Sequence, residues 1–271
     1  MTIRLLAVAD LHQRPAHYHR LAALVQKHQP QIIAFVGDFL NSDGNNGRNG
    51  LLTEAECAEC VAHLPAERTI FVRGNHEERN WAHFMDGWPK SKPLECLYGN
   101  ALVHGPLVIV GFPCPMGEEA TWAFTMPRSG TAVDIEARTA GREPLGVQVD
   151  TWLRPLVKKF GPAARTLWLM HMPPMGLPIA DRRSFNLLFI DAVENYKPLL
   201  TISGHDHHTP HLNGTWHARF DGTTCINAGQ DPDQTCFTVT DLTFSSSTPS
   251  LPKHIQVRAY PWNQNLAISP A

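Results

Sequence analysis

The stretch LLTISGHDHH, residues 199–208, places three histidines and an aspartate directly after a short apolar run. An apolar run of this length that stops at a glycine is typical of a buried β-strand. Histidine and aspartate side chains bind transition metals, and histidine also transfers protons near neutral pH. Because one such stretch carries little weight alone, its meaning depends on the residues that come after the other apolar runs.

Other apolar runs of the 271-residue chain, at 3–9, 32–36, 70–72 and 166–170, end in the same way. The polar residues that come after them are, in order, Asp10 and His12, Asp38, Asn75 and His76, and His171. In open α/β sheets, ligands gather outside the carboxyl ends of the strands. We therefore expect these side chains to meet those of the histidine-rich stretch, although they are spread over nearly 200 residues.

Each of these features has an ordinary explanation when it stands alone. An Asp-x-His pair is often a surface or capping pair, an Asp after Gly is usually part of a turn, and a strand-end histidine is often simply hydrogen-bonded. These explanations do not account for all the positions together, in order, each directly after a predicted strand. The whole series therefore indicates a metal-binding site.

Helical patterns separate the apolar runs, and their spacing predicts helices near 18–25, 148–160 and 185–196. Strands that alternate with helices are typical of βαβ units, so we expect a layered α/β architecture. The last third of the chain differs, because its short β-type segments are separated by turn residues. We expect these segments to form a second, more antiparallel sheet, at 211–217, 223–227, 234–240 and 254–260.

The length fits one large domain, which we expect over residues 1–262. Residues 113–144, rich in Gly, Pro, Thr and charged side chains, are expected to be a loop insertion, and such loops often act as lids. Residues 263–271 are expected to be a C-terminal tail. Cys57 and Cys60 form a C-x-x-C pair, but they lack a second pair and fit ordinary positions on a predicted helix.

The charge balance gives no sign of a polyanionic partner. The chain has 23 basic and 25 acidic residues, so binding to nucleic acid or to an anionic membrane surface is not expected. No apolar run reaches the length of about 20 residues that a membrane span needs, and the first residues lack the layout of a signal peptide. We therefore expect a cytoplasmic protein without a membrane partner.

The five polar blocks together resemble a known family. The series ADLH, GD, GNHE, H and GHDH is similar to the motif D-x-H, G-D, G-N-H-[DE], H and G-H-x-H of the calcineurin-like metallophosphoesterase superfamily. All blocks occur in order, and they span residues 10–207. The resemblance implies an α/β fold with a two-sheet β-sandwich flanked by helices, and a metal site at the strand ends.

The resemblance also implies two metal ions in each chain, with Asp38 as the bridge between them. The first ion would have the ligands Asp10, His12, Asp38 and His207. The second would have the ligands Asp38, Asn75, His171 and His205. This mixture of imidazole and oxygen ligands without thiolates suits manganese or iron, with zinc also acceptable.

The resemblance implies hydrolysis of a phosphoric ester. A water that bridges the two ions would be acidified to hydroxide and would attack phosphorus in line. His76 resembles the catalytic histidine that protonates the leaving oxygen or stabilises charge in the transition state. Asn75 and His76 would contact the substrate. Arg14 is a weaker candidate for a phosphate contact, since it also fits an ordinary surface position.

The local geometry expected around the histidine-rich stretch is simple. If the segment is extended, alternate side chains point to one side. His205 and His207 would then face the metals together, Asp206 would point away, and His208 would lie beside the site or face solvent. Three glycines would allow tight turns and close backbone approach next to the ligands; they are Gly37, Gly74 and Gly204.

The second block departs from that of the phosphoprotein phosphatases, which reads G-D-x-x-D-R-G. Here Asn41 and Ser42 stand where those enzymes have the Asp that supports the catalytic His and the Arg that holds phosphate. A small phosphorylated substrate such as a nucleotide is therefore expected, and a phosphodiester is favoured over a phosphomonoester. A non-catalytic protein-binding scaffold of this fold and a redox metalloprotein are the rival hypotheses. The sequence leaves the oligomeric state open.

Overall fold

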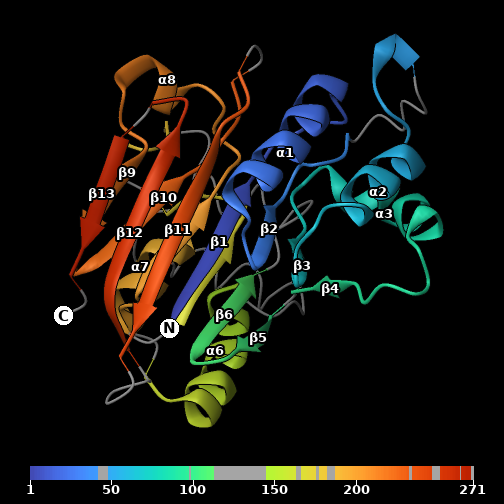
Figure 1. The fold of residues 1–271 in the computed structure, drawn as a ribbon. Helices are drawn as coiled ribbons and strands as arrows, with labels where there is room; N and C mark the ends of the chain where they lie inside the picture. Colours follow the sequence, from blue (N-terminus) through green and yellow to red (C-terminus); the bar gives the residue numbers. More distant parts are fainter. Residues whose placement is uncertain are drawn as a thin grey trace, which may run out of the picture.

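Two β-sheets lie face to face, and helices cover the outer face of each sheet (Figure 1). The structure is a computed structural model. It describes residues 1–41, 48–97, 99–112, 145–162, 166–174, 177–181, 187–231, 234–245, 251–262 and 264–269. The expected two-sheet α/β sandwich flanked by helices is confirmed.

The first sheet, here called sheet A, has seven strands in the order β13-β12-β11-β1-β2-β3-β4. Strands β1 to β4 pair in parallel, whereas β11, β12 and β13 add to the β1 edge in antiparallel pairs. The strand bounds are β1 Thr2–Val8, β2 Ile32–Val36, β3 Arg68–Val72, β4 Glu95–Cys96, β11 Phe237–Phe244, β12 Pro252–Tyr260 and β13 Gln264–Ile268.

The second sheet, sheet B, has six strands in the order β5-β6-β7-β8-β10-β9. Its inner strands pair in parallel, and the two edge strands, β5 and β9, are antiparallel to their neighbours. The strand bounds are β5 Asn100–His104, β6 Leu107–Phe112, β7 Thr166–Met170, β8 Leu200–Ser203, β9 His217–Phe220 and β10 Thr223–Asn227.

The helices that cover sheet A come from the first third of the chain, and those that cover sheet B come from nearer its middle. A short 3₁₀ turn covers Arg48–Gly50, and the five-residue helix α8 follows the histidine-rich stretch. The helix bounds are α1 Pro15–His28, α2 Glu54–Ala62, α3 Glu77–Gly87, α6 Leu145–Phe160, α7 Leu187–Tyr196 and α8 Thr209–Asn213. Cys57 and Cys60 both lie in α2, as the helical spacing predicts.

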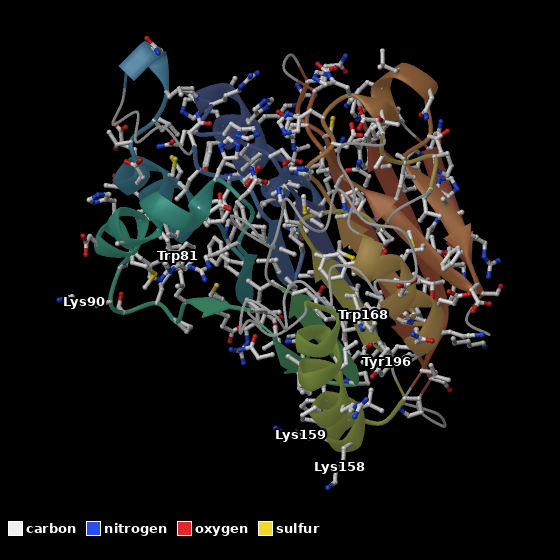
Figure 2. The ribbon with its side chains drawn as sticks, turned by 180° about the vertical axis from the view of Figure 1, so that it is seen from behind. Trp81, Lys90, Lys158, Lys159, Trp168 and Tyr196 are labelled. Atoms are coloured by element: carbon white, nitrogen blue, oxygen red, sulfur yellow. The ribbon has the colours of Figure 1, made fainter. Side chains whose placement is uncertain are left out.

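The central strands carry apolar side chains on both faces, because each strand is covered on both sides. Along β1, Leu5 and Ala7 face the interior between the sheets, while Leu6 and Val8 face the helices of sheet A. On the outer face of sheet B, Trp168 of β7 lies beside Tyr196 of α7 with ring centroids 6.3 Å apart (Figure 2). This packing fixes the relative position of the strand ends, where the polar residues lie.

Two expectations for the last third of the chain are wrong. Its strands do not form a separate antiparallel sheet: β9 and β10 extend sheet B, while β11 to β13 extend sheet A. The segment expected as a strand at 211–217 instead begins inside α8, which starts at Thr209 with a proline in its first turn, and β9 begins only at His217. The sequence reading also missed β5 and β6, although β6 is buried along its whole length.

The expected tail over 263–271 is also wrong for most of its length. Residues Gln264–Ile268 form strand β13, which pairs with β12, and Ile268 is only 5% exposed in the core between the sheets. This segment is so short that its pattern of apolar and polar residues does not distinguish a strand from a tail. The expected loop insertion at 113–144 lies outside the described residues. Within the described part of the chain, no helix has the length and apolar character that a membrane crossing requires.

Two leucines differ in burial, so their replacement by alanine should change the free energy of unfolding by very different amounts. Leu169 on β7 is fully buried there, whereas Leu212 on α8 is 85% exposed. We expect Leu169→Ala to lower the free energy of unfolding by about 2–5 kcal/mol through lost burial and a cavity. Leu212→Ala is the matched control and should change it by less than about 0.5 kcal/mol. Urea denaturation measures both values, and equal effects would contradict the described packing.

Candidate metal centre

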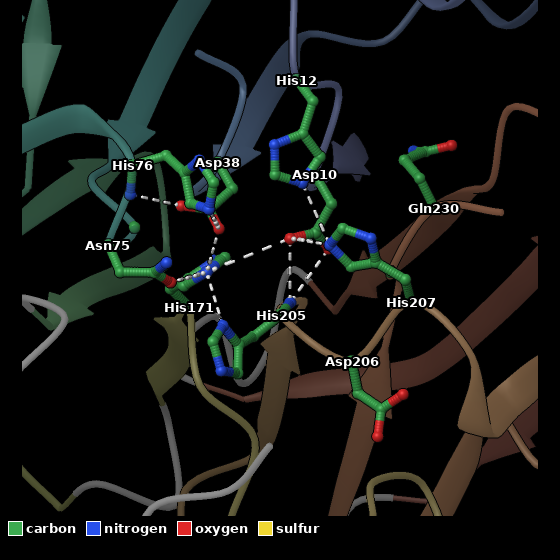
Figure 3. Close-up of polar contacts among 12 residues, drawn as sticks. Asp10, His12, Asp38, Asn75, His76, His171, His205, Asp206, His207 and Gln230 are labelled. Atoms are coloured by element: carbon green, nitrogen blue, oxygen red, sulfur yellow. Dashed lines mark hydrogen bonds and ion pairs between the residues drawn. The ribbon is translucent and has the colours of Figure 1, made fainter. Parts of the chain in front are cut away.

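Five strand ends from the two sheets bring the predicted residues to one place (Figure 3). In this view the labelled imidazoles surround the carboxylates of Asp10 and Asp38. Both carboxylates are buried, with each residue 1% exposed. The convergence expected from the position of these residues after their strands is therefore observed.

One group of candidate ligands consists of Asp10, His12 and His207. The Nε2 atoms of His12 and His207 lie 3.0 Å apart, and His207 Nε2 lies 3.4 Å from Asp10 Oδ1. Asp10 is held in turn by the backbone N–H of His205, which donates to both carboxylate oxygens at 3.0 and 2.9 Å. The first and last blocks of the sequence series thus meet at this group.

A second group consists of Asp38, His171 and His205, with Asn75 beside it. His171 Nε2 lies 3.1 Å from Asp38 Oδ2, 3.1 Å from Asn75 Oδ1 and 3.2 Å from His205 Nδ1. Asp38 also forms a candidate group with His12 and His76. Its carboxylate therefore lies between the residues of the two groups, where a bridging ligand is expected.

These separations are those of atoms that share a cation. With metal–nitrogen bonds of about 2.1 Å, two ligand atoms at right angles on one ion are about 3.0 Å apart, and at the tetrahedral angle about 3.4 Å apart. Two atom pairs of each group have such separations: 3.0 and 3.4 Å in the first group, and 3.1 and 3.2 Å in the second. The residues present thus fit two cations, one in each group.

The ring of His171 is oriented by the backbone of the other sheet. Its Nδ1 lies 2.9 Å from the carbonyl oxygen of Val36, so Nδ1 carries a proton and Nε2 faces the carboxylates. Burial disfavours the charged imidazole, but the Asp38 carboxylate outweighs it and raises the pKa of His171 to about 10. In this pocket a proton on Nε2 supplies the positive charge that a cation would supply when bound.

Two imidazoles of the site, those of His12 and His205, differ in charge from that of His171. Burial lowers the pKa of His12 to about 4, and burial together with the His171 charge lowers the pKa of His205 to about 4. Both rings are therefore neutral at pH 7, which is the state that binds metal. Burial opposes the ionisation of Asp38, yet the charge on His171 holds the pKa of Asp38 well below its usual range.

Four of these residues have left-handed backbone conformations, with φ of 55° at Asp10, 47° at His12, 51° at Asp38 and 68° at His205. Such conformations cost about 1–3 kcal/mol each for residues other than glycine and concentrate at functional sites. The expectation of an extended segment at residues 205–207 is therefore wrong. A turn, in which Asp206 N donates to Gly204 O at 2.8 Å, brings the two flanking histidines to their groups.

The directions expected for the remaining side chains of this stretch are observed, although the backbone differs. Asp206 points away from the metal groups in Figure 3, and His208 is exposed. The glycine expectations also hold in part. Gly37 has φ of 84°, and a Cβ at Gly74 or Gly204 would collide with Asp38 or Asp10, respectively.

The family model for calcineurin-like phosphoesterases matches residues 3–209. The chain belongs to the calcineurin-like phosphoesterase family. Members of this family are metal-dependent hydrolases of phosphoric esters with a dinuclear metal centre, and the clustered His and Asp side chains are candidate ligands for it. No curated protein matches the chain in sequence.

Solved structures of the same fold accompany the family match. A dimetal phosphatase of Danio rerio has a TM-score of 0.58 and 11% identity, with 99% of each chain covered. A Staphylococcus aureus protein assigned as a 5′-nucleotidase has a TM-score of 0.57 and 13% identity, with 100% of this chain and 54% of that one covered. GAP50, the anchor in the inner membrane complex of Plasmodium, has a TM-score of 0.55 and 11% identity, covering 100% and 89%. At these identities the likeness shows the fold alone.

The sequence analysis assigned no role to Glu77, the last residue of the GNHE block. Its buried carboxylate accepts three backbone N–H groups, from Asp38 at 2.9 Å, Leu40 at 2.9 Å and Gly74 at 2.6 Å. Burial and the nearby Asp38 carboxylate raise the pKa of Glu77, while the hydrogen bonds from Leu40 N and Gly74 N oppose this rise by favouring the carboxylate. Glu77 thus joins the loop after β2 to the loop after β3. An acidic residue directly after a predicted ligand and histidine was the available signal.

His76 and Asn41, two further residues of the sequence analysis, contact residues of the groups. The His76 backbone N–H donates to Asp38 Oδ1 at 2.9 Å, and its ring makes an edge contact with His12 at 4.8 Å. Asn41 donates from its side chain to the carbonyl oxygen of His12 at 3.1 Å. Arg14 is the N-cap residue of α1, and Ser42 lies outside the described residues.

Three backbone N–H groups donate to Glu77, so replacing its carboxylate by an amide should affect both stability and metal binding. Glu77→Gln would turn an amide NH₂ toward at least one backbone N–H, so we expect a loss of about 1–3 kcal/mol in unfolding free energy. Because Asp38 loses its support, Mn²⁺ binding should also weaken, as isothermal titration calorimetry would measure. Glu67→Gln is the control, because the Glu67 side chain is 63% exposed. Unchanged stability and unchanged Mn²⁺ affinity in Glu77→Gln would contradict this role.

Proposed function

We propose that this chain hydrolyses a small phosphoric ester at a centre of two metal ions. The supporting observation is that the buried carboxylates of Asp10 and Asp38 lie among imidazoles at the strand ends, with Asp38 between the two groups of candidate ligands. One ion would be held by Asp10, His12, Asp38 and His207. The other would be held by Asp38, Asn75, His171 and His205.

The chain's own residues divide the work around such a centre. When bound, the two cations would supply positive charge for the phosphoryl oxygens and a water acidified near neutral pH. Asn75 would orient the phosphoryl group, and His76 would donate a proton to the leaving oxygen. The His76 side chain is 27% exposed and lies 3.8 Å from Asp38, so it is next to the centre and still open to substrate.

Manganese or iron is the favoured metal, and zinc is the alternative. Imidazole nitrogen together with carboxylate and amide oxygen is a donor set of intermediate softness. No cysteine belongs to the candidate groups of the described residues, which argues against a site built for thiophilic metals. Octahedral and tetrahedral ligand separations both fit the observed range.

A phosphodiester is the favoured substrate class. Asn41 and Ser42 replace the residues with which the phosphoprotein phosphatases support the catalytic His and hold phosphate, and a diester carries less negative charge than a monoester dianion. A phosphomonoester, including a nucleotide, is the second candidate, because a protein assigned as a 5′-nucleotidase has the same fold. Arg14 remains a proposed phosphate contact, since it follows His12 by two residues.

A non-catalytic scaffold is the rival in a different class. The Plasmodium protein with this fold is described as an anchor, so the fold alone does not establish catalysis. In this chain every candidate ligand and His76 lie together. That arrangement favours the enzyme, acting in the cytoplasm on a small phosphorylated molecule.

The first test concerns Asp38, the carboxylate that would bridge the two ions. Protein stripped with a chelator and reloaded with Mn²⁺ should hydrolyse bis-p-nitrophenyl phosphate or p-nitrophenyl phosphate. Asp38→Asn keeps a side chain that tolerates positive φ but lacks the bridging charge, so turnover should fall to the level of the metal-free protein. Asp86→Asn, at an exposed position of α3, is the control.

The ratio of diester to monoester turnover distinguishes the two substrate classes. Two equivalents of bound Mn²⁺ without hydrolysis of either compound would contradict the proposal for these substrate classes. Failure to bind Mn²⁺, Fe²⁺ or Zn²⁺ would favour the scaffold.

The position of His76 predicts a dependence on the leaving group. In His76→Gln, kcat should fall by about 10²–10⁴-fold for an alkyl ester, since an alkoxide needs a proton to leave. The loss should be much smaller for p-nitrophenyl esters, because p-nitrophenolate leaves without protonation. His83→Gln, at an exposed position of α3, the helix that begins directly after His76, is the control. An equal loss for both leaving groups would rule out proton donation by His76.

A further inference from the structure

Asp206 lies between two candidate ligands, yet its side chain points away from them (Figure 3). The residue is 3% exposed, and its carboxylate receives four hydrogen bonds. Oδ1 accepts the backbone N–H groups of His208 at 2.9 Å and Thr209 at 2.8 Å. Oδ2 accepts the backbone N–H of Asp181 at 2.6 Å and the hydroxyl of Thr209 at 2.7 Å. All four partners are donors.

These bonds connect two loops that carry candidate ligands. Asp181 belongs to the chain that follows β7 and His171, whereas Thr209 begins α8 two residues after His207. The two loops follow the neighbouring parallel strands β7 and β8. Beyond the ends of these strands, the Asp206 carboxylate joins the loops through its bonds to Asp181 and Thr209. Gly204 N also donates to His171 O at 2.9 Å, nearer the strands.

A second side chain reinforces the same junction. Asn227, at the end of β10, is fully buried and donates to Ile179 O at 2.8 Å and to Asp206 O at 3.3 Å. Its Oδ1 accepts Gly229 N at 2.8 Å, and a Cβ at Gly229 would collide with Asp206 O. The chain after β7, the chain after β8 and the end of β10 are therefore fastened to one another around Asp206.

We propose that Asp206 is a positioning residue for the metal centre: it fixes the loop of His205 and His207 against the loop of His171. It thereby sets the distance from His171 to His205, a ligand of the same ion, and to His207, a ligand of the other ion. This role rests on the proposed function. A carboxylate is required, because an amide at this position would turn NH₂ toward backbone donors that cannot accept it. Holding His205 at φ of 68° also needs such fastening, since that conformation is unfavourable by itself.

The test compares Asp206→Asn with Asp221→Asn. Asp221 is in an exposed turn, pairs with Lys197 at 2.9 Å and has φ of 44°, which asparagine tolerates. We expect Asp206→Asn to bind at least one of two Mn²⁺ ions about 10–100-fold more weakly, the size of effect found for residues that orient metal ligands. Its electron paramagnetic resonance spectrum should lose the signal of a spin-coupled Mn²⁺ pair. Asp221→Asn should match the wild type in both measurements.

A second variant covers the case in which Asp206→Asn does not fold. Thr209→Val removes the hydroxyl donor and leaves the backbone N–H in place, so Mn²⁺ affinity should fall in the same direction but by less. Wild-type affinity and spin coupling in folded Asp206→Asn would overturn the positioning role while the proposed function stands; if that variant does not fold, wild-type values in Thr209→Val would do so. A wild-type chain that binds none of Mn²⁺, Fe²⁺ and Zn²⁺ would instead overturn the proposed function, and the positioning role with it. Because the readouts are metal affinity and spectrum, a wild type that binds two ions without hydrolysing the substrate leaves this test valid.

Discussion

The hydrogen bond from His171 Nδ1 to the carbonyl oxygen of Val36 joins the two sheets at the candidate metal centre. His171 follows β7 of sheet B, and Val36 ends β2 of sheet A, one residue before the Gly-Asp turn that carries Asp38. Each group of candidate ligands contains residues from both sheets, so the packing of the sheets sets the distances within each group. The same bond directs His171 Nε2 at buried carboxylates, whose negative charge would be costly without a proton or a cation beside them.

Much of the site could be predicted from the sequence, because its logic is that of strand ends. Asp10, Asp38 and His171 each follow a run that is apolar on both faces, and such runs identify central strands of a covered sheet. Once the strands are known to be parallel, their carboxyl ends must meet at one edge. The glycine before Asp38 was equally informative, since a turn with positive φ is required there.

What could not be predicted depends on contacts between distant segments. Neither the four bonds of Asp206 nor the three of Glu77 has a periodic signature, because their partners are backbone groups of loops. The left-handed conformation of His205 is invisible in a pattern that assumes an extended chain. Strand β13 was missed for a related reason: its five residues become a strand only through the edge that β12 offers.

The place of β1 in sheet A has a consequence for the order of events in the cell. β1 pairs with β2 on one side and with β11 on the other, so that Thr2 lies opposite Thr243. A ribosome releases the first ligands long before it has made the histidines of the last block or the strand that completes the sheet. Such long-range pairing makes folding slow. The complete set of candidate ligands therefore exists only after residue 207 has been made, so the proposed centre could bind both of its ions only late in synthesis or after it.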